Sequence, residues 1–231
     1  MYLFRRFPLL LIVWATVIST SPQARTPDEA PRQSLRLQVS LFNDAQVDPA
    51  TLARAQSRAS AIFAHSGIEV DWLVCAAADP GDFAPRRTAC STLSWPAHLS
   101  VRIRPGALSA SADTFGQAFV DAGGEGVYSN VYYQNLSRSS RHPELSDAEM
   151  LGCVLAHELG HLLLGANSHS ASGVMQARWD ASTLRIAAES SLFFTPAQSA
   201  ALRSHLPRPC EGTSAACPAQ RPVLISIAYR P

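Results

Sequence analysis

One pentapeptide, His157 to His161, carries the side chains best suited to chemistry. Its two histidines are four residues apart, and Glu158 directly follows the first. On a helix, residues four apart share a face, so both imidazoles can reach one ion. Zinc binds imidazole nitrogens at about 2.0–2.1 Å, and such a pair supplies two of its ligands. Glu158 is rotated by about 100° from His157, so we expect it to act as general base on a zinc-bound water and not as a ligand.

The remaining ligand must come from further along the chain, because a catalytic zinc needs three protein ligands and an open position for water. His169 is the first candidate, since Gly165 ends the expected helix and lets the chain turn back. Glu189 is the competing candidate, and Asp180 is a weaker one. With Glu189 as ligand the chain would resemble the gluzincins, in which a second helix brings a glutamate to the metal.

A known pattern resembles this stretch. The pentapeptide followed by Gly165, His169 and Met175 resembles the metzincin clan of zinc endopeptidases, whose pattern is H-E-x-x-H-x-x-G-x-x-H followed by a turn that carries a methionine. Here Gly165 lies four positions after His161 and His169 four after Gly165, where the clan has three each time. The third histidine is therefore displaced by two residues. The resemblance implies a zincin-like fold, with Met175 shaping the apolar floor of the site.

The function predicted from these residues is that of an exported zinc-dependent metallopeptidase acting on a protein or peptide. Two alternatives stay open: a zincin whose third ligand is Glu189, and an exported zinc-binding interaction domain without catalysis. Glu158 argues against the second, because a closed structural site needs no base. Formal net charge is +1 and no run of basic residues occurs, so no nucleic-acid partner is expected. The sequence carries no signal for an oligomeric state.

Hydrophobic spacing predicts the elements that hold the motif. Apolar residues alternate at 35–41, 68–72 and 99–103, which predicts strands, and residues 49–65 have the period of a helix. The β-branched and aromatic stretch 127–133 is a further strand, which the zincin resemblance places in the cleft beside an extended peptide. Its tyrosines could stabilise an oxyanion or simply pack. Ser146 and Glu149 form a capping box for a helix over 147–164, and Trp179 is expected to pack under the methionine turn.

The fold class that follows is α+β and zincin-like: a small mixed sheet packed on the active-site helix, with a C-terminal helical subdomain. We expect a signal peptide at 1–24, with Arg5 and Arg6 before the apolar run Leu9–Ile18. A polar lead-in follows at 25–34, then the peptidase domain at 35–206 and a proline-rich tail at 207–231. The location is then secreted or periplasmic, without a stable membrane span after signal removal; an uncleaved anchor is the alternative.

Five cysteines fit an exported chain. Cys75 and Cys90 flank one polar loop, and Cys210 and Cys217 flank another, so each pair is predicted to form a local disulfide. Cys153 falls within the predicted helix and is expected to be a free, buried thiol.

Overall fold

A computed structural model describes residues 34–75, 84–106, 114–139 and 145–207. Five strands in these ranges form one mixed sheet in the order β2-β1-β3-β5-β4. The strands are β1 (Leu35–Asn43), β2 (Ile68–Cys75), β3 (His98–Arg104), β4 (Gly116–Phe119) and β5 (Tyr128–Tyr132). The helices are α1 (Pro49–His65), α2 (Ala84–Ser91), α3 (Tyr133–Ser139), α4 (Asp147–Leu164), α5 (Ala181–Ala188) and α6 (Pro196–His205).

The sheet is parallel except at one edge. β1 lies between β2 and β3 and pairs with both in parallel. β5 pairs in parallel with β3 on one side and antiparallel with β4 on the other. The expectation that residues 127–133 receive a peptide is therefore wrong, because both sides of β5 are already paired. β4 is the strand at this edge of the sheet.

Local signals set the ends of the two long helices. α1 begins after Asp48, whose carboxylate accepts hydrogen bonds from two backbone N–H groups, and Pro49 occupies its first turn. α4 begins after Ser146, whose hydroxyl accepts from the Glu149 N–H, and it ends at Gly165, where φ is 88°. The predicted capping box is only half formed: the Glu149 carboxylate instead lies 3.4 Å from the Arg58 guanidinium on α1.

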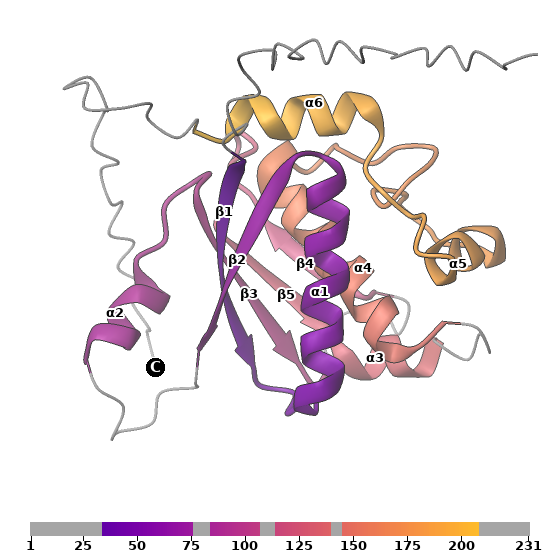
Figure 1. Cartoon of the computed structure of the whole chain (residues 1–231), viewed down its shortest axis with the longest axis horizontal. Coiled ribbons are helices and arrows are strands. Elements are labelled where there is room, and N and C mark those ends of the chain that lie inside the picture. The colour runs from indigo at the N-terminus through magenta and orange to yellow at the C-terminus, as the bar shows by residue number, and fades with distance from the viewer. Residues whose placement is uncertain (1–33, 76–83, 107–113, 140–144, 208–231) are drawn as a thin grey trace, which may run out of the picture. The chain divides into compact units, whose positions relative to one another are not determined.

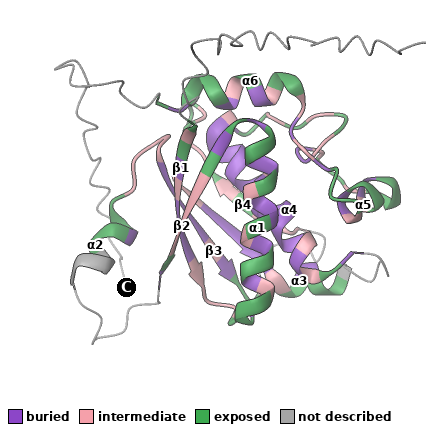
Figure 2. Ribbon diagram, viewed as in Figure 1, coloured by how far each residue is buried: buried purple, intermediate pink, exposed green. Residues whose placement is uncertain are grey.

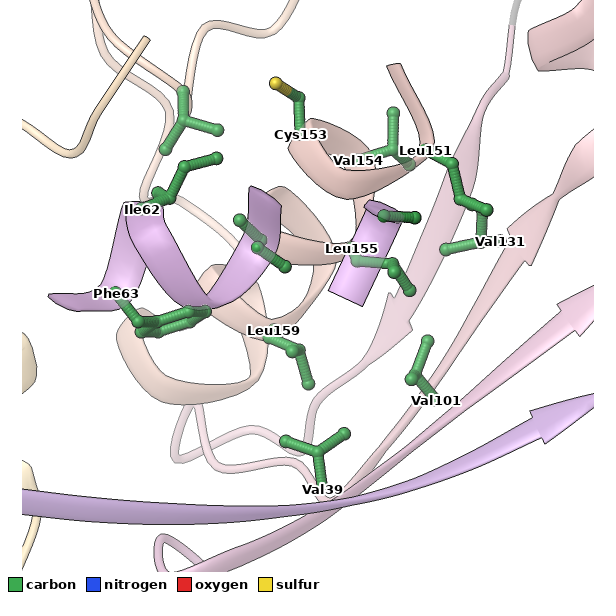
Figure 3. Packing of buried hydrophobic residues seen from close by; sticks show 14 of the residues in the cluster. Val39, Ile62, Phe63, Val101, Val131, Leu151, Cys153, Val154, Leu155 and Leu159 are labelled. Atoms are coloured by element: carbon green, nitrogen blue, oxygen red, sulfur yellow. The ribbon is translucent and has the colours of Figure 1, made fainter. Parts of the chain in front are cut away.

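Helix α4 occupies the centre of the molecule. It packs against α1, and both helices cover the same face of the sheet (Figure 1). Figure 2 shows α4 buried along most of its length, which explains why its sequence is apolar on nearly every side. Leu155 and Leu159 fill the space between α1 and the strands that carry Val39 and Val101 (Figure 3), and all four side chains are fully buried. The pentapeptide His157 to His161 therefore lies in a helix that the rest of the fold covers along most of its length.

The cysteine predictions are confirmed where the structure describes them. Cys75 at the end of β2 and Cys90 in α2 form a disulfide, and α2 itself lies in a region predicted to be a loop. Cys153 is free and buried, and burial raises the pKa of its thiol to about 11, so it is unreactive near neutral pH. Cys210 and Cys217 lie outside the described residues, as do the predicted signal peptide, almost all of the lead-in and of the tail, and His142.

No helix within the described ranges is long and apolar enough to cross a membrane.

Gly152 marks the closest approach of α4 to α1. A Cβ atom built on it would lie 2.7 Å from the Ala55 carbonyl oxygen and 2.6 Å from Cβ of Arg58. Because a backbone oxygen cannot move aside, we expect Gly152→Ala to lower the free energy of unfolding by about 1–3 kcal/mol, although alanine favours helices. Urea unfolding measures this. Gly106→Ala, whose methyl group would meet only the Gln134 amide at 3.3 Å, is the control, and equal stabilities would contradict the packing described.

Candidate metal centre

Three histidine side chains converge at the C-terminal half of α4. The helix places the Nε2 atoms of His157 and His161 3.1 Å apart. His169 reaches them from the loop after Gly165, with its Nε2 atom 3.0 Å from that of His161. The ligand atoms of all three lie within 4.8 Å of one another, so the cluster could hold one metal ion. Nitrogen atoms bound to tetrahedral zinc at about 2.05 Å would lie about 3.3 Å apart, close to the distances observed.

Hydrogen bonds at the opposite ring nitrogens fix the orientation of two imidazoles. His157 Nδ1 donates to the Val174 carbonyl oxygen at 2.8 Å. His161 Nδ1 lies 3.0 Å from Ser168 Oγ and 3.2 Å from the Gly165 oxygen, and the Ser168 hydroxyl donates to that same oxygen at 2.7 Å. With a proton on each Nδ1, the Nε2 atoms present lone pairs to the cluster, which is the form that binds metals.

The two helix histidines are held neutral by burial. Desolvation lowers the pKa of His157 to about 4, and it also lowers the pKa of His161, which is 7% exposed. Two neutral Nε2 lone pairs that face each other at 3.1 Å repel unless a proton or a cation lies between them. Since the low pKa disfavours the extra proton, the donor set fits a metal cation.

Glu158 lies in the same helical turn and is 5% exposed. Its carboxyl group packs against Gly116, the first residue of β4, so closely that a Cβ atom on residue 116 would overlap it. Desolvation raises the pKa of Glu158 to about 8. The edge strand and the acidic side chain are thus in direct contact, and a side chain on residue 116 would require the Glu158 carboxyl group to shift.

A turn that carries Met175 packs against α4 at Gly160. It closes with a hydrogen bond from Gln176 N to the Gly173 oxygen at 3.2 Å, and φ of Gly173 is 83°. Met175 is fully buried, and its sulfur would lie 2.6 Å from a Cβ atom on Gly160. The same turn supplies the Val174 oxygen that orients His157, so it holds both the helix and one imidazole. The Trp179 ring stands nearly perpendicular to that imidazole, at 6.0 Å.

The competing ligands do not join the cluster. Glu189 is exposed at the C-terminal end of α5, and Asp180 caps the N-terminus of that helix. Hydrogen bonds from Ser182 and Thr183 lower the pKa of Asp180 to about 2, so its carboxylate is already engaged. The only group of three or more possible ligands in the described residues is the histidine cluster.

The other histidines and the tyrosines pack elsewhere. His65 stacks on Phe193, His98 hydrogen-bonds to Ser40, and His205 stands edge-on to Trp95. The hydroxyls of Tyr128 and Tyr132 donate to Asn130 and Gln117, and Tyr133 packs against the core.

Three groups at the site escaped the sequence analysis: the Val174 carbonyl, the Ser168 hydroxyl and the Gln198 amide. A backbone carbonyl has no sequence signal. Ser168 could have been noticed only as the neighbour of His169. Gln198 lies 30 residues from Ser168, whose carbonyl it contacts, so only the fold brings them together.

No protein-family model and no curated protein matches the chain. Among solved structures, a zinc-dependent peptidase from Methanocorpusculum labreanum is 15% identical over 71% of this chain and 99% of its own, with a TM-score of 0.47. Archaemetzincin from Methanopyrus kandleri is 20% identical over 76% and 97%, with a TM-score of 0.46. Metalloproteinase-II from Bacteroides fragilis is 16% identical over 74% and 53%, with a TM-score of 0.45.

The raised pKa of Glu158 predicts a dependence of stability on pH. The ordinary pKa of a glutamate is 4.5, and that of Glu158 in the folded protein is about 8. Between these pH values the folded protein keeps a proton on Glu158 that the unfolded chain has lost. Rising pH therefore destabilises the fold over this window. Glu158→Gln removes this pH dependence. In chelator, the free energy of unfolding of the variant should therefore increase relative to that of the parent as pH rises. The difference should reach a few kcal/mol, at about 1.4 kcal/mol per pKa unit.

Urea unfolding at pH 5, 6.5 and 8 measures the difference. The lowered pKa of His157 acts in the opposite direction, stabilising the fold as pH rises from about 4 to 6.5. Both proteins carry this histidine, so its contribution cancels. A stability difference that stays constant across the three pH values would contradict the buried, protonated carboxyl.

Proposed function

We propose that this chain is a zinc metallopeptidase in which His157, His161 and His169 hold the metal and Glu158 is the general base. The observation that carries the proposal is the convergence of three histidine Nε2 atoms beside a buried glutamate of the same helical turn. Three nitrogen ligands leave one position of a tetrahedral zinc open, as hydrolytic sites require, whereas structural zinc sites are closed by four protein ligands.

The chemistry divides between the ion and the chain. Zinc, when bound, polarises a carbonyl oxygen and lowers the pKa of water towards about 7. Glu158 takes a proton from the attacking water and later passes it to the leaving amine. Without a cation, burial raises the pKa of this carboxyl to about 8. A positive charge nearby favours the carboxylate, so metal binding would bring Glu158 into the form that accepts a proton.

Strand β4 is the best-supported binding edge for a peptide substrate. β4 is one of the two edge strands of the described sheet, and it pairs only with β5. Its first residue, Gly116, contacts the Glu158 carboxyl group. An extended peptide that adds to this edge would form backbone hydrogen bonds and would bring a peptide bond near the general base.

Export remains part of the proposal. The disulfide between Cys75 and Cys90 is of the kind that persists in oxidising compartments, which supports a secreted or periplasmic location for the peptidase.

The third ligand is tested by metal affinity. We expect one zinc per chain, and His169→Ala should weaken zinc binding by well over the 10–100-fold that the loss of an outer hydrogen-bond partner costs. Glu189→Ala should leave the affinity unchanged, because that side chain is exposed and lies outside the cluster. Competition titrations with a chelator measure both. If affinity collapses in the Glu189 variant instead, the metal is liganded by glutamate and the proposed ligand set is wrong.

The base is tested by separating catalysis from metal binding. Glu158→Gln should keep zinc and lose about 10²–10⁴-fold in the rate of peptide hydrolysis, the usual contribution of general acid–base catalysis. Glu189→Gln removes an exposed carboxylate of the same kind and serves as the control, with no loss of rate. An unstructured protein substrate and mass spectrometry of the products make the assay independent of cleavage preference. Full activity in Glu158→Gln would exclude the mechanism.

A further inference from the structure

His169 lies on the loop after α4, so the helix does not fix its position. α4 fixes His157 and His161, but His169 follows Gly165 on an irregular, largely exposed loop. This loop is two residues longer than in the pattern that the sequence resembles. An exposed ligand on a longer loop samples more conformations before binding, and ordering it costs free energy that lowers metal affinity. Some other contact must restrict the loop.

Gln198, in the first turn of α6, contacts the loop on both sides of His169. Its side-chain amide nitrogen donates to the Ser168 carbonyl oxygen at 2.9 Å and to Ser170 Oγ at 3.1 Å. Its amide oxygen accepts from Thr195 N at 3.0 Å. The oxygen of the amide is thus committed to the helix cap, which leaves the nitrogen to face the loop.

Helix α6 is a firm support for this amide. A full capping box of Thr195 and Gln198 begins the helix. Ser199 then hydrogen-bonds to Ser66 at 2.8 Å, and Arg203 donates to the Ser66 carbonyl at 3.1 Å, both at the end of α1. Leu202 is fully buried in the core. The loop is therefore tied to an element that is itself fixed to α1.

A second contact completes the hold. Ser170 N donates to the Met175 carbonyl oxygen at 3.0 Å, which links the loop to the turn beneath α4. The segment that carries His169 is thus held from two directions, by α6 and by the methionine turn.

We infer that Gln198 is a positioning residue for His169, which it presents to the metal by fixing the backbone on either side. The inference rests on the proposed function, since it takes His169 as a ligand. Gln198 touches neither metal nor substrate; it lowers the cost of ordering the ligand loop, so its contribution is to zinc affinity and site geometry.

Gln198→Glu separates the two roles of this side chain. A glutamate oxygen can still accept from Thr195 N, so the capping box and the helix persist. The two donated hydrogen bonds are lost, and a carboxylate oxygen now faces the Ser168 carbonyl oxygen. We expect zinc affinity to fall about tenfold or more, with the melting temperature in chelator nearly unchanged. With cobalt(II) in place of zinc, the visible absorption bands should change as the third nitrogen is misplaced.

Two comparisons make the result specific. Ala197→Glu introduces the same charge at the neighbouring, exposed position of α6, and it should keep zinc affinity within about twofold. In a His169→Ala background, Gln198→Glu should have no further effect, because coupled positions are not additive. Ser170→Ala, which removes one acceptor of the pair, should weaken zinc less than Gln198→Glu does.

The outcomes distinguish this inference from the proposed function. If His169→Ala leaves zinc affinity unchanged, His169 is not a ligand, and the ligand set and the positioning role fail together. If His169→Ala abolishes tight binding but Gln198→Glu keeps the parent affinity and cobalt spectrum, the positioning role alone is overturned. A loss of melting temperature in chelator without a loss of zinc affinity would likewise reduce Gln198 to a helix cap.

Discussion

The structure depends on accommodating three polar side chains on an apolar helix: Glu158 and His161 are buried and His157 is half-buried. α4 is covered on almost every side, yet it carries His157, Glu158 and His161. Buried polar groups are tolerated only when they are hydrogen-bonded or neutralised. The Nδ1 atom of His157 meets this demand through the Val174 carbonyl oxygen, and that of His161 through the Gly165 carbonyl oxygen and the Ser168 hydroxyl. A cation bound by the Nε2 atoms would meet it there, so the proposed metal site would also satisfy the demand of the core.

The surrounding elements follow from that constraint. The chain after α4 turns back at Gly165 and supplies the third imidazole, then passes beneath the helix, where Met175 fills the space beside Gly160. α6 holds the returning loop through Gln198. On the other side, the Glu158 carboxyl group packs directly against Gly116, the first residue of β4. Each contact lies outside the pentapeptide, yet each limits how its side chains can move.

The sequence was most informative where local rules decide the structure. The bounds of α1 and α4 were predicted correctly, because Pro49 and Gly165 mark helix ends through backbone conformation alone. The histidine cluster was anticipated from helical spacing and a returning chain. The capping box was half wrong, since Glu149 found a partner on α1, and no local rule could foresee Arg58 there.

Pairing between distant segments was beyond the sequence. The β-branched and aromatic stretch 127–133 predicts a strand but not its neighbours. The resemblance therefore places the cleft at β5, whereas the edge strand is β4. The residues that became β4 are few and rich in small side chains, which weakens any periodic signal. The contact between Gln198 and the loop that carries His169 could not be predicted from the sequence, because a glutamine that only caps a helix looks the same there.

In the proposed site, one zinc ion would be bound by the imidazole nitrogens of His157, His161 and His169 and by an oxygen atom from water. X-ray absorption at the zinc edge of the reconstituted protein tests it most directly, since imidazole rings give characteristic multiple scattering. We expect three imidazoles, with zinc–nitrogen distances of about 2.0–2.1 Å, and one oxygen atom from water. A sulfur shell at about 2.3 Å, or a spectrum fitted by only two imidazoles, would contradict it.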